Sequence, residues 1–212
     1  MRATTTSPQI SIWTSGTCTP MSLVIAFIGV KGAAMGGDMR EIITRGDERS
    51  TQTLEDELYS GRIVTDADLK KRADDLGIFI SIRDDKRKVT ARDGILVGEV
   101  SESEGGVVKK RRLYATGGEY ALAEVTGSRI HISGSGKASN FMVLGNRITQ
   151  EVARACIREH WNNGTIHDAI RVIMLAMERA SDTTASVSAL YTLIQTPATA
   201  SLSAVIERDS RD

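Results

Sequence analysis

The sequence predicts an α+β fold built in layers, with sheets in the middle and helices packed over them. Three observations lead to this class: a run of short segments with β-strand patterning, a pair of amphipathic helical segments after that run, and one more strand-like segment beyond the pair. Strands and helices that are grouped in this way favour packed layers. At 212 residues the chain is long enough for one well-filled core.

The first globular stretch, residues 22–42, reads SLVIAFIGVKGAAMGGDMREI. It contains two apolar runs that are separated by Gly29, Lys31 and Gly32. Apolar runs joined by a short glycine-containing segment are typical of two paired strands. The sequence therefore predicts that the fold starts with a β-hairpin.

The pattern after the hairpin changes twice. Residues 53–76 have apolar positions at helical spacing, with Thr65 as an N-cap and Gly77 as a stop, and are expected to form two helices. Between residues 78 and 132 the β pattern returns as short segments separated by turn residues at regular intervals. This second region predicts a run of antiparallel strands.

Two amphipathic helices are expected near the end of the chain, at about 150–161 and 166–180. The second has Thr165 as its cap and Asp168 in its first turn. Residues 187–194 then have the composition of another strand.

The two ends of the chain differ from the middle. Residues 1–20 hold nine Ser or Thr, two of the three prolines and a single charge, Arg2. We therefore expect residues 1–21 to be a leader or a misassigned start that is absent from the active protein. Residues 22–196 would form the domain, and residues 197–212, rich in Thr, Ser and Ala, would be a partly mobile tail.

Charge and cysteine content exclude several classes of protein. The chain has 27 Lys and Arg against 27 Asp and Glu, so no net charge attracts nucleic acid or an anionic membrane. Cys18 and Cys156 are too few for a disulfide framework or a four-ligand metal site, and the histidines show no ligand spacing with them. No apolar run approaches the roughly 18 residues of a spanning helix. We expect a cytoplasmic protein with no metal, nucleic acid or membrane as a partner.

Two short motifs have alternative interpretations. Residues 134–137 read GSGK, but a phosphate-binding loop needs a glycine where His131 stands and a Ser or Thr where Ala138 stands. The basic run Lys109–Arg112 would alternate between the two faces of a strand, and no aromatic series accompanies it. Neither motif predicts a ligand site, and we expect no cofactor.

The residue that carries the predicted chemistry is Ser22. A serine hydroxyl is a poor nucleophile until a base takes its proton, and a serine at the start of a chain can use its own α-amino group as that base. The ordinary pKa of this amine, about 7.7 to 8.0, suits it to general-base catalysis near neutral pH. The hypothesis requires that residues 1–21 be removed. Initiation at Met21 followed by loss of that methionine would expose Ser22 directly, whereas self-cleaving enzymes usually present a glycine before the nucleophile.

Asp38 is the second candidate residue, sixteen positions after Ser22 in the segment GGDMR. Gly36 and Gly37 leave space at the end of the second expected strand. A carboxylate at that end would position a cation or the terminal amine.

These residues resemble a known group. The order of elements resembles the proteasome β-subunit branch of the N-terminal nucleophile hydrolases. That order is a small nucleophile, an apolar strand, a glycine turn, a second apolar strand and then Asp-x-Arg, which is Asp38 and Arg40 here. Together with ELYSGRI, ILVGEV and GSGKASNFMVLGN, the stretch more closely resembles a proteasome-like family of methanogenic archaea, the Connectase-type protein ligases. The resemblance extends from Ser22 to about Thr196.

The resemblance implies a four-layer αββα sandwich in which residues 53–76 are a helical insertion. It implies a terminal Ser or Thr that attacks a peptide carbonyl and forms an acyl-enzyme. It also implies a lysine ahead of an extended strand and beside the nucleophile, for which Lys88 in KVTARDGILVGEV is the best match. Because the insertion lengthens the interval before this lysine, Lys86, Lys70 and Lys71 remain alternatives.

Two further elements follow from the resemblance. A Gly-Ser-Gly turn before the first core helix is matched by Gly134, Ser135 and Gly136, which would orient the terminal amine or face the developing oxyanion. An Asp followed three residues later by a Ser is matched only loosely, by Asp182 with a Thr or Ser two or four residues later.

Three functions are compatible with these residues. The acyl group on Ser22 passes to the amino terminus of an acceptor polypeptide in a ligase, and to water in a peptidase. A third possibility is a protein that keeps the fold and only binds peptide. The resemblance favours ligation, and implies as substrate a peptide segment associated with the A subunit of the methanogen methyltransferase complex. The inserted helices at 53–76 are our candidate for the substrate cleft.

Overall fold

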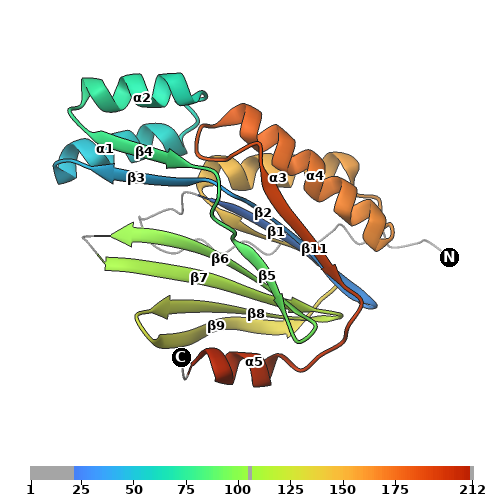
Figure 1. The fold of residues 1–212 in the computed structure, drawn as a ribbon. Coiled ribbons are helices and arrows are strands. Elements are labelled where there is room, and N and C mark those ends of the chain that lie inside the picture. The colour runs from blue at the N-terminus through green and yellow to red at the C-terminus, as the bar shows by residue number, and fades with distance from the viewer. Residues whose placement is uncertain (1–21, 105–106, 211–212) are drawn as a thin grey trace.

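The computed structural model describes residues 22–104 and 107–210 (Figure 1). The expected leader, residues 1–21, lies outside the described residues. The strands are β1 (Leu23–Gly29), β2 (Gly32–Asp38), β3 (Glu41–Arg45), β4 (Phe79–Arg83), β5 (Val89–Arg92), β6 (Ile95–Glu104), β7 (Val107–Thr116), β8 (Glu119–Thr126), β9 (Arg129–Lys137), β10 (Asn140–Gly145) and β11 (Tyr191–Thr196). The helices are α1 (Glu48–Tyr59), α2 (Asp66–Asp75), α3 (Arg147–His160), α4 (Ile166–Thr183) and α5 (Leu202–Asp209).

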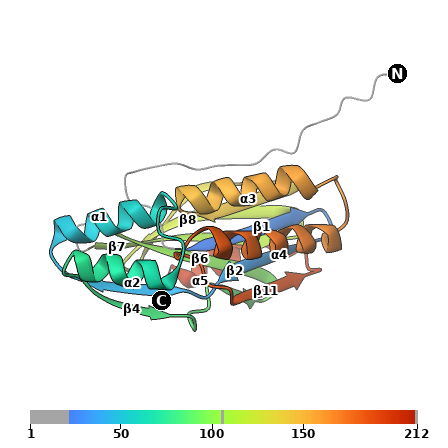
Figure 2. The same cartoon turned by 90° about the horizontal axis from the view of Figure 1, so that it is seen from above.

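The elements stack in layers, as Figures 1 and 2 show. An antiparallel four-stranded sheet has the order β10-β1-β2-β11, and α3 and α4 pack on one of its faces. A five-stranded antiparallel sheet, β5-β6-β7-β8-β9, packs on the other face. Helix α5 covers the far side of that second sheet. The predicted mixed α+β class with antiparallel sheets is confirmed, and the described layers are helices, sheet, sheet and helix.

Strand β1 is central because both of its faces are buried. Leu23, Ile25 and Phe27 point to the core under α3 and α4, whereas the intervening residues point to the second sheet. A strand buried on both faces has a continuous apolar sequence, which is what LVIAFIG provides. The predicted hairpin is confirmed, since β1 pairs with β2 from Val24↔Gly37 to Gly29↔Gly32.

A helical unit, defined here as β3, β4, α1 and α2, stands beside the layered body with its own small core (Figure 1). Helix α1 begins at Glu48, earlier than the predicted start at residue 53, because the Asp47 carboxylate accepts a hydrogen bond from Ser50 N and caps the helix. Thr65 caps α2 as predicted. Gly77 has φ of +68°, a left-handed conformation that glycine adopts easily.

The end of the chain differs from the predicted mobile tail. Leu202 and Val205 of α5 are buried against the second sheet. Asp209 accepts hydrogen bonds from Arg92, Arg112 and Tyr114. Residues 197–212 have few apolar positions among many polar ones, and a mobile polar tail can have the same pattern. The packing of α5 on the second sheet could therefore not be predicted from the sequence.

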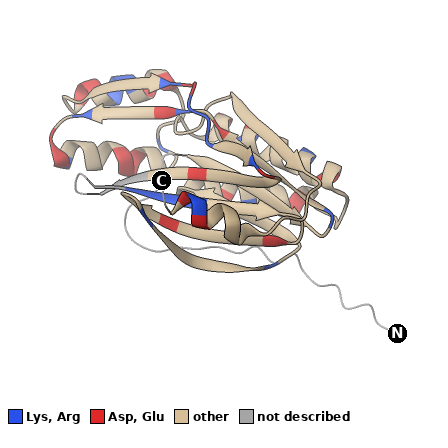
Figure 3. Cartoon of the chain, turned by 60° about the horizontal axis from the view of Figure 1, so that its bottom comes forward, with Lys and Arg blue, Asp and Glu red and all other residues tan. Residues whose placement is uncertain are grey.

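Charged residues of both signs are interspersed over the described elements (Figure 3). On β7, Lys110 and Arg112 form ion pairs with Glu99 of the neighbouring β6. The positive charges of Lys110 and Arg112 are thus partly neutralised by an acidic neighbour. Among the described residues, no helix has both the length and the apolar character needed to cross a lipid bilayer.

Candidate active site

A fully buried carboxylate, Asp38, stands at the last position of β2. Its Oδ1 accepts a hydrogen bond from Leu23 N at 2.8 Å. Its Oδ2 accepts one from Arg40 N at 2.9 Å and one from Lys88 Nζ at 2.7 Å. Burial of an ionised carboxylate is costly unless it is paired and hydrogen-bonded, and Asp38 meets both conditions. It also connects the start of β1 to the segment that precedes β5.

Lys88 completes a buried ion pair with Asp38. Its Nζ donates to Asp38 Oδ2 and also to the main-chain oxygen of Arg40, at 2.7 Å in each case. Burial lowers the pKa of Lys88, although the Asp38 charge and hydrogen bond act in the opposite direction. Of the lysines considered, Lys88 is the one that meets Asp38, whereas Lys86 pairs with Glu41.

The backbone around β2 explains how Lys88 reaches this position. Lys86 N donates to Met39 O and Glu99 N donates to Lys88 O, so residues 86–88 cross the end of β2 and then enter the second sheet. A Cβ at Gly37 would come within 2.5 Å of Val89 Cγ2. The missing side chain at Gly37 therefore lets the start of β5 lie directly on β2.

Ser22 is 5% exposed and directly precedes β1. The next residue, Leu23, donates its amide to Asp38 and pairs in register with Gly145 of β10. A Cβ at Gly145 would lie 2.8 Å from Ser22 O. Ser22 thus sits between the Asp38–Lys88 pair and the turn that leads from β10 into α3.

That turn carries a polar residue, Asn146, that the sequence did not single out. It contacts Ser186, which, like Thr184, was considered with Asp182 as part of a family motif. Asn146 is fully buried and caps α3 by accepting from Thr149 N. Its Nδ2 donates to Ser186 Oγ at 3.0 Å, and Ser186 Oγ lies 3.1 Å from Thr184 Oγ1. The signal in the sequence was Asn followed by Thr three residues later, directly after an apolar strand, which is typical of a helix N-terminus.

Gly134, Ser135 and Gly136 do not form the predicted turn before the first core helix. They belong to β9, where Ser135 is exposed and pairs with Ala121 of β8. The glycines were interpreted as a turn, but the β8 ladder keeps them extended, and β10 follows before α3 begins. The equivalent place before α3 is held by residues 145–146. Asp182 lies exposed near the end of α4, and its described contacts do not include Asp38 or Lys88.

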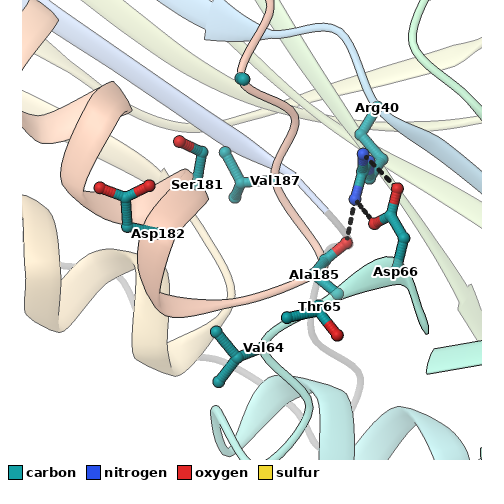
Figure 4. A pocket seen from close by; sticks show the side chains of 9 residues that line it. Arg40, Val64, Thr65, Asp66, Ser181, Asp182, Ala185 and Val187 are labelled. Carbon is teal, nitrogen blue, oxygen red and sulfur yellow. Dashed lines mark hydrogen bonds and ion pairs between the residues drawn. The ribbon is translucent and has the colours of Figure 1, made fainter. Parts of the chain in front are cut away.

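A pocket of about 370 Å³ opens where the helical unit meets the end of α4 (Figure 4). Arg40 and Asp66 lie on one side of it, and Ser181 and Asp182 on the other. Val64, Thr65, Ala185, Val187 and Ala189 complete its lining. The main chain of Arg40 contacts both members of the Asp38–Lys88 pair, so the pocket adjoins the candidate site. The described residues contain no group of three or more His, Cys, Asp or Glu arranged to hold a metal ion.

The fold and the site define a mixed α+β protein with a buried Asp–Lys pair at the amino-terminal end of its central strand. The family model described as "Connectase MJ0548-like, N-terminal domain" matches residues 21–211. The chain belongs to this family. None of the curated proteins compared with the sequence matches it.

Several solved structures of Anbu, the ancestral β-subunit, are similar to the chain. Anbu from Yersinia bercovieri is 10% identical, with a TM-score of 0.40 over 82% of this chain and 81% of that one. A Gly-1 mutant of Anbu from Hyphomicrobium sp. strain MC1 is 9% identical, with a TM-score of 0.38 over 81% and 79%. The helical assembly of the Anbu complex from Pseudomonas aeruginosa gives 12% identity and a TM-score of 0.36 over 82% and 80%.

Proposed function

We propose that the chain, shortened so that it begins at Ser22, is an acyl-transfer enzyme that ligates polypeptides through an acyl-enzyme. The observation that carries this proposal is the buried Asp38–Lys88 pair, which is hydrogen-bonded to the residue directly after Ser22. Membership of the Connectase family supports the ligase class, and the family match begins at Met21, next to the proposed start. The observed layers agree with the αββα sandwich of N-terminal nucleophile hydrolases.

The reaction has two balanced steps. Ser22 Oγ attacks the scissile carbonyl while the α-amine of Ser22 takes the hydroxyl proton; the C–N bond then breaks, and that proton goes to the departing amine. An acceptor amine next attacks the ester carbonyl and gives a proton to the α-amine of Ser22; the C–O bond breaks, and that proton passes to Ser22 Oγ. The products are a joined polypeptide and the released segment.

Lys88 and Asp38 have different roles in this scheme. In its charged form, Lys88 stabilises the serine oxygen as that oxygen loses its proton. Asp38 holds Lys88 and fixes the start of β1, so that the nucleophile stays at one position. Such preorganisation raises the rate of the reaction, because the groups need no rearrangement while the charge develops.

Ligation requires that the acceptor amine react faster than water. An acceptor held in place reaches an effective molarity on the order of 10⁵ M or more, which is enough to outcompete solvent. The pocket beside Arg40 is our candidate for binding a peptide substrate, because residues 64–66 of the helical unit line it. The competing function is a peptidase, in which water is the acceptor.

The first experiment is the intact mass of the protein purified from its native host. We expect the mass of a chain that starts at Ser22. A chain that keeps residues 1–21 would exclude the terminal-amine mechanism. The shortened wild type should then form a covalent adduct with one of a set of overlapping peptides that cover the methyltransferase A subunit. Ser22→Ala should form none, whereas Ser203→Ala, which changes an exposed serine of α5, should behave as the wild type.

The second experiment separates the two enzyme functions. A reactive peptide is incubated with the enzyme, with and without a second peptide that has a free amino terminus. A joined product supports ligation. Accumulation of the free acid alone would identify a peptidase, and failure of every peptide to form an adduct would leave only a binding function.

A further inference from the structure

The side chain of Arg40 connects the helical unit to the layered body. Its Nη1 donates to Asp66 Oδ1 at the start of α2, and its Nε and Nη2 donate to the two oxygens of Asp84 after β4. Nη1 also donates to Ala185 O, just after α4, at 2.8 Å. One buried guanidinium therefore holds three segments that are far apart in the sequence. Figure 4 shows its contacts with Asp66 and Ala185.

The main chain of the same residue belongs to the candidate active site. Arg40 N donates to Asp38 Oδ2, and Arg40 O accepts from Lys88 Nζ. The distance between these main-chain atoms and the guanidinium is the length of one side chain. Arg40 therefore joins the helical unit, through its side chain, to two of the contacts that define the Asp38–Lys88 pair, through its main chain.

We propose that Asp66 and Asp84 are positioning residues that act through Arg40 and couple the helical unit to Lys88. This inference rests on the proposed function for its kinetic consequences, but the coupling itself is a property of the folded protein. Through this coupling, the position of the helical unit affects the geometry of the candidate active site. A peptide that occupies the adjoining pocket would contact Asp66 and so act on Lys88 through Arg40.

The charges in this cluster explain why both carboxylates matter. Burial by itself would lower the pKa of Arg40, but its hydrogen bonds to Asp84 and Asp66 and their charges together raise it. The groups whose charges act on Lys88 are Asp38, which favours its charged form, and Lys86 and Arg40, which oppose it. Asp66 and Asp84 offset the charge of Arg40. Removing either carboxylate makes the surroundings of Lys88 more positive and favours neutral lysine.

The test is an NMR titration of the full chain with ¹³C-labelled lysine, in which the Lys88 signal is assigned from its absence in Lys88→Arg. In Asp66→Asn and in Asp84→Asn, we expect the Lys88 titration to move to lower pH by about a few tenths of a pH unit or more. Asp66→Glu keeps the charge and should stay near the wild type. Glu57→Gln is the matched control, because it breaks the ion pair with Arg72 inside the same helical unit but away from Arg40.

Kinetics give the second readout. If the protein forms an acyl-enzyme, both Asn variants should lower kcat by roughly 10-fold or more, because misplaced catalytic groups lose rate steeply. The side chains of Asp66 and Asp84 are 48% and 33% exposed, so these variants are expected to fold. If one of these two variants does not fold, the other variant still tests the proposal.

The proposal is wrong if a folded Asn variant leaves the Lys88 titration where Glu57→Gln leaves it. The same holds if Glu57→Gln shifts the titration as much as the Asn variants do. Failure of the proposed function gives a different result, in which no peptide adduct forms in any variant while the Lys88 titration still responds to Asp66→Asn.

Discussion

Lys88 Nζ lies 2.7 Å from Asp38 Oδ2, although fifty residues separate the two in the sequence. Both side chains are buried, at 3% and 0% exposure. The whole helical unit lies between them in the chain, so the contact closes a long loop that contains this unit.

Replacement of Asp38 should destabilise the protein strongly. Asp38→Ala leaves Leu23 N and Arg40 N without their acceptor and the buried Lys88 ammonium without its counter-ion. Breaking a buried ion pair by removing one partner costs about 3 to 5 kcal/mol in the free energy of unfolding. Urea unfolding of wild type and variant measures this difference.

The matched control for that experiment is Asp182→Ala, which removes an exposed carboxylate near the end of α4. A surface change of this kind should alter the free energy of unfolding by no more than about 0.5 kcal/mol. Equal effects of the two substitutions would contradict the importance of the buried pair.

The rate of adduct formation should depend on pH with a bell-shaped profile. The rate rises as the α-amine loses its proton and falls as Lys88 loses its charge. Because burial lowers the pKa of Lys88 below its ordinary value of 10.5, the falling limb should begin at lower pH than an exposed lysine would give. Lys88→Arg stays charged and should lose that falling limb, whereas Lys137→Gln, at an exposed lysine, should keep it. A wild-type rate that does not fall by pH 10.5 would refute the role of charged Lys88.

Gly36 and Gly37 offer a test that separates activity from stability. A Cβ at Gly36 would come within 2.6 Å of Ile173 Cγ2 on α4, and one at Gly37 within 2.5 Å of Val89 Cγ2 beside Lys88. Each glycine-to-alanine change should cost about 1 to 3 kcal/mol in the free energy of unfolding through overpacking. Only Gly37→Ala should also slow adduct formation in the folded protein. If Gly36→Ala slows it equally, the contact of β2 with β5 has no special relation to the site.

Removal of the Asp209 carboxylate should loosen α5. Asp209→Ala leaves Tyr114 Oη without its acceptor and removes one of the two carboxylates that pair with Arg112, and hydrogen bonds to charged groups contribute about 1.5 to 3 kcal/mol each. We expect faster amide hydrogen exchange in α5 and a lower urea midpoint. Arg208→Ala, which breaks an exposed ion pair with Asp93, should change either quantity little. Unchanged exchange in the Asp209 variant would show that apolar packing alone holds the helix.

Local sequence patterns predicted the elements that are specified by residues close together in the sequence. The hairpin of β1 and β2 followed from two apolar runs, and the start of α4 followed from Thr165 and Asp168, which form a capping box. The place of Asp38 in GGDMR, sixteen residues after Ser22, singled it out, and the resemblance of the sequence to a family pointed to Lys88. The resemblance left Lys86, Lys70 and Lys71 as alternatives, because only the crossing of residues 86–88 over β2 selects Lys88.

Features that depend on tertiary pairing were harder to predict. Ser135 was interpreted as a turn residue because Gly134, Ser135 and Gly136 match the Gly-Ser-Gly turn that the resemblance implies, but pairing with a neighbouring strand decides whether such a segment is extended. Asn146 and Ser186 are forty residues apart, and their hydrogen bond arises only when β10 and the end of α4 meet. The contacts of Arg40 with Asp66 and Asp84 are likewise invisible until the helical unit is placed.

The pairing of β1 on both sides fixes where the amine of the proposed active chain would lie. Leu23↔Gly145 on one side and Val24↔Gly37 on the other leave this strand no freedom to slide. A chain that starts one residue earlier or later would move its terminal amine by about 3.3 Å along the strand. If the active chain begins at Ser22, as we propose, the two ladders fix the place of its amine, and a start shifted by one residue would give a folded protein with its amine in the wrong place.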